Sequence, residues 1–300
     1  MAPHSRVLIC RHSQAEHNVD LDYSIPDAPL TALGRKQSGA LPRQTQQEQQ
    51  QVDAILSSGL RRTLQSTLLG WAPAVQRLGI ANVVVMPQLQ ECNDFPCDTG
   101  SAREELERDP EFKGFDFSLL TPDWTSKKGF WAPDPESIDQ RARWVRRHVR
   151  ERPEKTILIV AHGDFIRRLT GDVQGPSTYQ WKNAEVRAYR FDPASVDSDA
   201  AFFQAEGEVA VAGGHDQTST EMIEDGSAAD ASTGPSLPGL SSTGASLGLT
   251  GEDSLREIEE RVKVKAYAVQ SQASELQELE ARLAAAERKK AELEAKGIKI

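Results

Sequence analysis

Short apolar runs alternate with longer amphipathic stretches along residues 1–190. The apolar runs are rich in Val, Ile and Leu, and the clearest of them is TILIVA at residues 156–161. The intervening stretches repeat apolar residues at helical spacing, as around Trp144. Strands and helices that alternate in this way are typical of a mostly parallel sheet covered by helices on both faces. We therefore expect an α/β fold.

The same pattern predicts the bounds of the individual elements. The expected strands are residues 6–10, 52–56, 82–86, 156–161 and 184–191, the last of them at an edge of the sheet. The expected helices are residues 31–49 with Thr31 as the cap, 60–78, 137–150, and one that begins at 164–170. Residues 91–136 are irregular, with repeated Pro, Gly and aromatic residues. A long segment of that kind often covers a site, although a surface excursion without a role is the alternative.

The composition changes from about residue 195, where Ser, Gly, Ala, Thr and Asp take over. Too little of this stretch can be buried to offset the entropy lost on ordering it. Residues 200–211 are the exception, because AAFFQAEGEVAV can add a last strand to the sheet. We place the catalytic domain at residues 1–205 and interpret residues 206–251 as a disordered acidic linker.

Residues 252–297 show the heptad spacing of a coiled-coil helix. The first apolar row is Leu255, Val262, Val269, Leu276 and Leu283, and the second is Ile258, Leu279, Ala286 and Leu293. Lys265, Gln272 and Lys290 interrupt these rows. Self-association or docking on a partner helix is one interpretation, and a single solvated helix is the other.

Charge and cysteine content exclude several classes of function. The formal charge of −10 arises in residues 191–255, which hold twelve acidic and no basic residues, while residues 1–190 are nearly neutral. A general nucleic-acid surface is therefore not expected. The three cysteines are too few for a disulfide framework and do not pair with histidines at zinc spacing, so no metal site is expected. No run has the length of a signal peptide or a membrane span, so we expect a cytoplasmic protein that does not bind membranes.

Charge-handling residues follow the ends of four expected strands. His12 follows the first strand, Arg61 and Arg62 follow the second, Glu91 comes after the third, and His162 follows residues 156–161. Carboxyl ends of parallel strands meet at one edge of a sheet, where ligands of such folds bind. We therefore expect these side chains to converge.

This set of side chains suits phosphoryl transfer. A neutral imidazole such as that of His12 attacks phosphorus without losing a proton first. Arginine forks stabilise the equatorial oxygens of the transition state, as Mg²⁺ does in kinases. A carboxylic acid protonates the leaving alkoxide, and Glu91 is the candidate, with Asp94, Asp98 and Asp164 as the alternatives on neighbouring loops. His162 can supply a further donor.

Five segments in order and spacing resemble the histidine phosphatase superfamily, in its branch close to cofactor-dependent phosphoglycerate mutases. They are Arg11-His12-Ser13 with Asn18, where Ser stands for the usual Gly; PLTALGRKQ; SSGLRRTLQST, where Gly59 stands for Pro; LQE with Glu91; and AHG with His162. The elements PCDTGS and DFS with a later Trp are similar to those of fungal phosphoglycerate-mutase-like proteins. The resemblance covers residues 5–205.

The resemblance implies a phosphohistidine on His12, with Glu91 as the proton donor. It also implies that Arg11, Arg62 and His162 hold the phosphoryl group, that Asn18 assists, and that no cofactor is needed. Water releases phosphate in a phosphatase, whereas a second substrate hydroxyl accepts the group in a mutase. The substrate-loop features of a glycolytic mutase are not evident, so we expect a phosphatase of small phosphorylated substrates. The alternatives are a mutase, or a scaffold or sensor that acts through its coiled coil.

One further pattern competes with this assignment. Cys97 and Arg103 fit C-x₅-R, the skeleton of cysteine-dependent phosphatases, but no buried strand precedes Cys97, and Asp98 would repel phosphate beside the sulfur. We interpret that match as accidental. Arg61 is expected to be a solvated helix residue. The remaining histidines lack supporting context and are expected to be exposed; they are His4, His17, His148 and His215.

Overall fold

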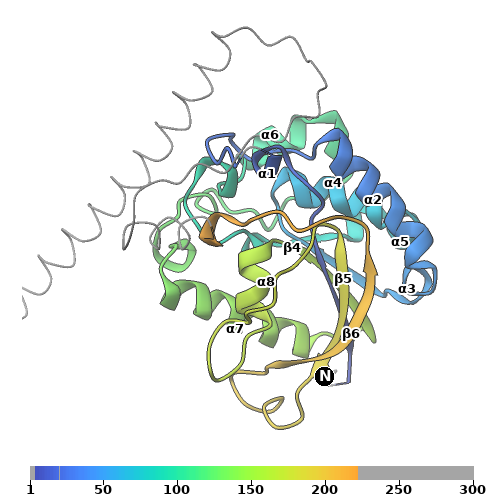
Figure 1. The fold of residues 1–300 in the computed structure, drawn as a ribbon, viewed down its shortest axis with the longest axis vertical. Helices are drawn as coiled ribbons and strands as arrows, with labels where there is room; N and C mark the ends of the chain where they lie inside the picture. The colour runs from blue at the N-terminus through green and yellow to red at the C-terminus, as the bar shows by residue number, and fades with distance from the viewer. Residues whose placement is uncertain (1–3, 20, 222–300) are drawn as a thin grey trace, which may run out of the picture. The chain divides into compact units, whose positions relative to one another are not determined.

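The computed structural model describes residues 4–19 and 21–221. These residues form a six-stranded sheet with the order β3-β2-β4-β1-β5-β6 (Figure 1). Its strands are β1 Arg6–Arg11, β2 Ala54–Ser57, β3 Val84–Val85, β4 Thr156–Ala161, β5 Glu185–Phe191 and β6 Phe203–Val211. Neighbours among β1 to β4 pair in parallel, whereas β5 runs antiparallel to β1, and β6 antiparallel to β5. The expected mostly parallel α/β sheet is confirmed.

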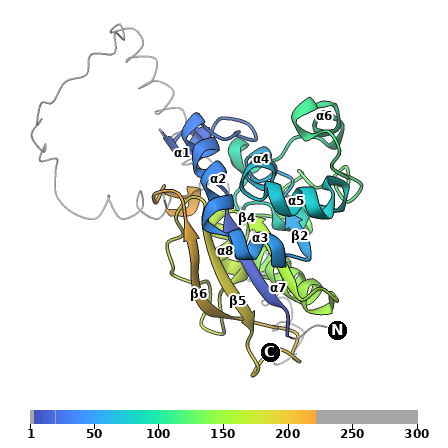
Figure 2. The ribbon, with the colours of Figure 1, turned by 90° about the vertical axis from the view of Figure 1, so that its right-hand side faces the viewer.

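Helices cover both faces of this sheet (Figures 1 and 2). Figure 2 shows α2, α3 and α5 in front of the sheet, with α7 and α8 on the other side. The helices are α1 Glu16–Val19, α2 Ala32–Gln44, α3 Gln46–Gln51, α4 Arg61–Gly70, α5 Ala72–Leu78, α6 Arg103–Arg108, α7 Pro135–Glu151 and α8 Gly163–Leu169. Short 3₁₀ turns at Pro87–Leu89, Pro96–Asp98 and Pro110–Phe112 shape the irregular stretch.

The two central strands supply alternate side chains to two hydrophobic clusters. Leu158 and Val160 of β4 join Leu64 in the cluster under α4, while Ile157 and Ile159 join the cluster under α7 and α8. Successive side chains of a strand point to opposite faces, so a strand buried on both faces must be apolar throughout. This requirement explains TILIVA and fixes the strand that delivers His162.

Two expected helices are each split in two, and prolines lie at both breaks. The helix expected at residues 31–49 ends at Gln44, two residues after Pro42, and α3 begins at Gln46. The helix expected at residues 60–78 breaks at Trp71, with Pro73 in the first turn of α5. Proline has no N–H to donate to the preceding turn, so it tends to end or restart a helix.

The end of the domain differs from the expected boundary. β5 is not an edge strand, because the strand expected at residues 200–211 forms as β6 and pairs with it. The boundary expected at residue 205 falls inside β6, and the chain continues past Val211 to contact the domain through Glu221. Most of the expected linker and the expected coiled coil at residues 252–297 lie outside the described residues.

No helix within residues 4–19 and 21–221 is both long enough and apolar enough to cross a membrane.

Candidate active site

His12 lies at the carboxyl edge of the sheet, where β1, β2 and β4 end. Its backbone continues the pairing of β1 with β4, since His12 N–H donates to the Ala161 carbonyl at 3.0 Å. Its Nδ1 lies 2.7 Å from the Ser13 carbonyl, which can only accept, so Nδ1 carries the hydrogen. Nε2 therefore carries the lone pair and can act as an acceptor or a nucleophile. Arg62 Nε–H points at that nitrogen from 3.3 Å.

Burial and positive neighbours keep His12 uncharged. The side chain is almost fully buried. Burial, followed by the charges of Arg62 and Arg11, lowers the pKa of His12 well below its usual value of 6.5. A neutral imidazole with an available Nε2 lone pair is the form that can act as a nucleophile.

Arg62 is fixed in the first turn of α4, just after β2. Its side chain is fully buried. Nη1 donates to the Cys97 carbonyl at 2.5 Å, and Nη2 donates to Asp98 Oδ1 at 3.1 Å. These bonds set the plane of the guanidinium group before any substrate arrives.

Arg11 approaches His12 from the end of β1. Nη1 donates to the Trp181 carbonyl, and Nη2 donates to the Asp216 carbonyl at 2.9 Å. Its Nε is buried and has no hydrogen-bond partner among the described residues. Arg11 therefore brings a second buried positive charge, with a donor still available, to the same place as Arg62.

His162 caps α8 immediately after β4. Its ring centroid lies 5.2 Å from that of His12, and its Nε2 lies 2.9 Å from Ser58 Oγ, at the end of β2. Nδ1 is buried and has no partner within the described part of the chain. Burial, followed by the charge of Arg62, lowers the pKa of His162 well below 6.5. His162 is thus a neutral, oriented imidazole next to His12.

Glu91 reaches the same edge from the segment after β3. Oε1 accepts the backbone N–H groups of Cys92 and Phe165, both at 2.9 Å, and Oε2 lies 3.3 Å from the N–H of Asp164. Burial, then the charges of Asp164 and Asp98, raises the pKa of Glu91 from 4.5 to about 8. Glu91 is therefore protonated at neutral pH and able to donate a proton.

Asn18 and His17 lie together in the single turn of α1. Asn18 Oδ1 accepts the Ala15 N–H at 3.0 Å, and Asn18 Nδ2 lies 3.2 Å from His17 Nε2. The expectation that His17 is exposed is wrong: only 5% of it is exposed, and its ring centroid lies 6.1 Å from that of His12. Its Nδ1 is buried without a partner in the described chain. Its position next to Asn18 in the first motif is the one sequence signal that pointed to it.

Hydrogen bonds and close packing from two helices hold the loop after His12. Ser13, which stands where glycine is usual, places its hydroxyl 2.6 Å from the buried Ser38 hydroxyl, and its N–H donates to Ser66 Oγ at 3.0 Å. Gly34 of LTALG is required for a close approach, because a Cβ there would lie 1.9 Å from the Gln14 carbonyl oxygen. The loop that carries His12 is thus held by α2 and α4.

Asp98 and Asp164 complete the ring of buried charges around the site. They are 1% and 5% exposed, respectively. Asp98 pairs with Arg62, and the backbone of Asp164 contacts Glu91. Burial raises the pKa of Asp164. The sequence indicated Asp98 and Asp164 only as alternatives to Glu91 as the proton donor. In the structure both lie close enough to raise the pKa of Glu91.

The cysteine-phosphatase pattern does not form a site. Burial, followed by Asp98, raises the pKa of the Cys97 thiol, so the thiolate is disfavoured. Arg103 is directed to Glu107 on the surface of α6 rather than to Cys97.

Arg61 is not a freely solvated residue as expected, because its guanidinium group bonds Asp109 at 2.5 Å and lies 3.8 Å from Asp27.

The other histidines lie away from this edge. His4 and His215 are exposed as expected, whereas His148 is half-buried and stacks on Trp144 with ring centroids 5.0 Å apart.

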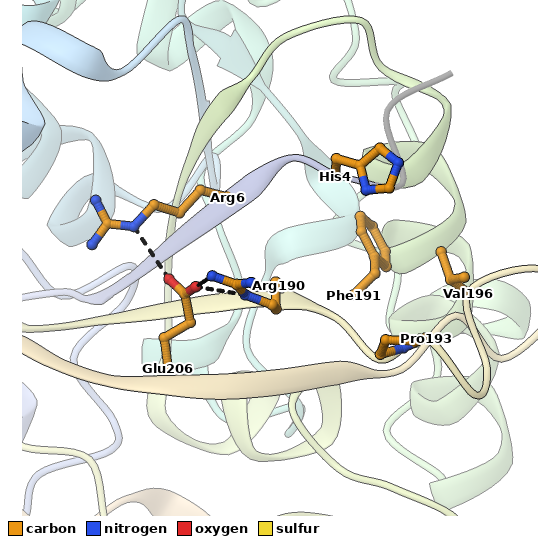
Figure 3. Close-up of a pocket in the computed structure, with 7 residues that line it drawn as sticks. All are labelled: His4, Arg6, Arg190, Phe191, Pro193, Val196 and Glu206. Atoms are coloured by element: carbon orange, nitrogen blue, oxygen red, sulfur yellow. Dashed lines mark hydrogen bonds and ion pairs between the residues drawn. The ribbon is translucent and has the colours of Figure 1, made fainter.

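His4 lines a pocket of about 560 Å³ at the opposite end of β1 (Figure 3). Both arginines of that pocket, Arg6 and Arg190, are already bound by Glu206. The pocket therefore lacks an arginine whose charge is unpaired.

Comparison with known proteins places these features in a family. The sequence model of the histidine phosphatase superfamily (branch 1) matches residues 7–198. A probable phosphatase of Schizosaccharomyces pombe is 31% identical over 174 residues, which are 57% of this chain and 79% of that protein. A phosphoserine phosphatase variant of Entamoeba histolytica, solved with phosphoserine, is 20% identical and covers 69% of this chain and 97% of its own, with a TM-score of 0.44. A mycobacterial glucosyl-3-phosphoglycerate phosphatase solved with VO3 is 20% identical, with a TM-score of 0.41. The match covers 69% of this chain and 99% of that protein's chain.

Proposed function

Because the chain belongs to the histidine phosphatase superfamily (branch 1), we propose that it hydrolyses small phosphomonoesters through a phosphohistidine formed on His12. One observation carries the proposal: a neutral His12, whose Nε2 bears a lone pair directed towards Arg62 Nε–H, lies among buried nitrogen atoms without partners in the described chain. They are Arg11 Nε and His17 Nδ1, which carry hydrogens, and His162 Nδ1, which carries one when Ser58 donates to Nε2. Buried donors of this kind are costly unless an acceptor binds them. A phosphoryl group has three oxygens that can accept these hydrogen bonds.

In the first step, His12 Nε2 attacks phosphorus in line with the leaving oxygen. The N–P bond forms as the P–O bond breaks, and Glu91 gives its proton to the leaving alkoxide. Arg62 Nε–H, which points at Nε2 in the resting site, turns to a phosphoryl oxygen as the substrate enters. The products of this step are an alcohol, a phosphohistidine and the Glu91 carboxylate.

In the second step, water attacks the phosphohistidine. Glu91, now a carboxylate, takes a proton from the water as its oxygen bonds to phosphorus, and the N–P bond breaks. His12 returns to the neutral form, and inorganic phosphate leaves. Arg11 and Arg62 stabilise the equatorial oxygens in both steps, the role that Mg²⁺ plays in other phosphoryl-transfer enzymes. Catalysis is therefore proposed to need no metal ion.

Phosphate release from p-nitrophenyl phosphate in the presence of EDTA tests this proposal. We expect turnover, an acid-labile ³²P label on the protein after mixing with labelled substrate, and loss of both in His12→Ala. His148→Ala is the matched control, because that histidine stacks on Trp144 on the surface of α7. Turnover that requires a divalent metal, or that survives in His12→Ala, would overturn the proposal.

A Cys97→Ala variant separates the two nucleophiles that the sequence offers. The buried thiol contacts Asp98 rather than His12, so the label on histidine should persist in this variant. Loss of labelling in Cys97→Ala together with its retention in His12→Ala would assign the chemistry to the cysteine instead.

A further inference from the structure

Residues 214–221 follow β6 and cross the carboxyl edge of the sheet. In Figure 1 the orange end of the described chain runs from β6 over the ends of the strands to α8. Its first anchor is Asp216, whose backbone carbonyl accepts Arg11 Nη2–H at 2.9 Å. The Asp216 carboxylate accepts from Gln14 Nε2 at 3.1 Å and from Asn183 Nδ2. A guanidinium donor of the phosphate site is thus occupied by the chain itself.

Two hydroxyl groups and one backbone N–H of residues 218–220 bind the buried carboxylates of the site. Thr218 Oγ1 donates to Asp164 Oδ1 at 2.6 Å, and Ser219 Oγ donates to Asp98 Oδ2 at 2.8 Å. The Thr220 N–H donates to Asp164 Oδ2 at 3.1 Å. Thr218 and Ser219 are 6% and 4% exposed, respectively, so these bonds are shielded from water.

The two carboxylates connect the segment directly to the proposed chemistry. Asp98 binds Arg62 through its other oxygen, and the backbone N–H of Asp164 lies 3.3 Å from Glu91 Oε2. The hydroxyls of the segment therefore lie one side chain away from the phosphate-binding arginine and from the proton donor. That is the side of the site where the leaving group of a substrate must lie, because Glu91 protonates it.

The segment also packs closely enough to exclude a ligand. A Cβ placed on Gly163 would lie 2.6 Å from Thr218 Cγ2 and 3.3 Å from Arg11 Nε. His12, Arg11, Glu91 and His162 are each less than 5% exposed beneath it. Binding a phosphomonoester at this edge requires the segment to move.

We propose that residues 214–221 are an internal inhibitory ligand that occupies the leaving-group side of the active site. Asp98 and Asp164, which hold its hydroxyls, then bind hydroxyl or ammonium donors on the leaving group of a substrate. This inference rests on the proposed phosphatase function of His12. It identifies the substrates as phosphomonoesters of polyhydroxylated or amino alcohols, for which the segment is a mimic without a phosphate.

The bonds that hold the segment are of a kind that a substrate can replace. Every residue from His215 to Glu221 is polar, so no apolar side chain anchors it. A phosphoryl oxygen carries more negative charge than the Asp216 carbonyl and binds Arg11 more strongly. Glu221 lies 3.9 Å from Arg167 and 3.6 Å from His215, and its ion pair with Arg167 is partly exposed. Such pairs contribute little to stability.

Kinetics of the full chain test the inference. An internal competitor raises the apparent KM without changing kcat, because it must leave before the substrate binds. Replacing both hydroxyls, in Thr218→Ala combined with Ser219→Ala, should lower the KM for p-nitrophenyl phosphate by roughly tenfold with kcat unchanged. Ser219→Glu should do the same, since a carboxylate there faces Asp98. Ser198→Glu in the exposed turn before β6 is the matched control and should leave KM unchanged.

Substrate preference tests the role of the carboxylates. In the segment variant, Asp164→Asn should lower kcat/KM for glycerol 2-phosphate by about tenfold, while phenyl phosphate, which has no hydroxyl to donate, should change less. Equal losses for both substrates would remove Asp164 from the leaving-group side.

Hydrogen exchange of the unmodified full chain provides a measurement that needs no substitution. Addition of inorganic phosphate should speed exchange of the backbone amides of residues 214–221. Unchanged KM in the segment variants, or unchanged exchange with phosphate bound, overturns the inference and leaves the function of His12 untouched. Turnover that persists in His12→Ala overturns the proposed function itself. The two failures are therefore distinguishable.

Discussion

Replacing Glu91 with glutamine should make the protein more stable at alkaline pH and less active. Burial, with Asp164 and Asp98 next, raises the pKa of Glu91 from 4.5 to about 8, so the folded protein holds a proton that the unfolded chain releases. Stability from this group is fully present below about pH 4.5 and is lost as the pH rises through about 8. A shift of this size corresponds to a loss on the order of 5 kcal/mol at pH 9 relative to acid pH.

Glutamine at position 91 should remove this loss of stability at alkaline pH. Its carbonyl oxygen can accept the N–H groups of Cys92 and Phe165, as Oε1 does now, while its NH₂ group faces the Asp164 N–H at a small cost. Urea unfolding at pH 6 and pH 9 measures the effect. The wild-type free energy of unfolding should fall by several kcal/mol between the two pH values, and that of Glu91→Gln should fall much less. Glu105→Gln, at an exposed carboxylate of α6, should behave like the wild type.

The same variant should change the pH profile of kcat/KM. The phosphorylation step needs protonated Glu91 and neutral His12, so wild-type kcat/KM should fall about tenfold per pH unit above pH 8. Because the pKa of His12 is lowered, its protonation should not limit activity near neutral pH. Glu91→Gln should lose that alkaline limb and about 10²–10⁴-fold in kcat with alkyl phosphates. A wild-type profile that stays flat beyond pH 9, with the same stability at pH 6 and 9, would refute the assignment of the proton to Glu91.

Three further outcomes are expected. Gly34→Ala should lower the free energy of urea unfolding by about 3 kcal/mol, because its Cβ meets the Gln14 carbonyl, whereas Gly39→Ala in the same helix has open space and should stabilise slightly. His17→Ala should lower kcat/KM by about tenfold through loss of its buried donor, with partial recovery in His17→Gln. If residues 252–297 form a coiled coil between chains, deleting them should convert an oligomer into a monomer, as measured by light scattering. A protein that is monomeric both with and without these residues contradicts self-association.

The sequence was sufficient to place the residues that follow buried strands. TILIVA and VLIC are apolar throughout, as strands covered on both faces must be, so the residues that follow them had to meet at one edge. His12 and His162 follow such strands directly, and their rings lie 5.2 Å apart. The position of residues at strand ends is therefore predictable from pattern and topology alone.

Residues without a strand to place them could not be located in this way. His17 lies in a four-residue helix, too short to show an apolar period, and the fold of the loop alone turns it towards His12. Residues 214–221 have the polar composition of a linker, and the expected domain end at residue 205 left them outside. Their burial depends on partners such as Asp98 and Asp164, which are more than 50 residues away along the chain. Composition reports how much apolar surface a segment can bury, but it does not report polar contacts of this kind.

In the proposed mechanism, the two arginines explain how one site binds a phosphoryl group and is also closed by its own chain. Arg62 is held by the Cys97 carbonyl and by Asp98, so the plane of its guanidinium group is set before phosphate enters, and in the proposed mechanism only its Nε–H changes acceptor. Arg11 is fixed by Trp181 through one nitrogen, while its other terminal nitrogen binds Asp216, a residue of the inhibitory segment. In the proposed closed state, substrate entry displaces one neutral acceptor at Arg11 and two hydroxyl donors at Asp98 and Asp164, together with the Thr220 N–H at Asp164. A phosphomonoester that carries its own hydroxyls replaces the acceptor and both hydroxyls, whereas one without them replaces only the acceptor, so we expect the closed state to select the substrate.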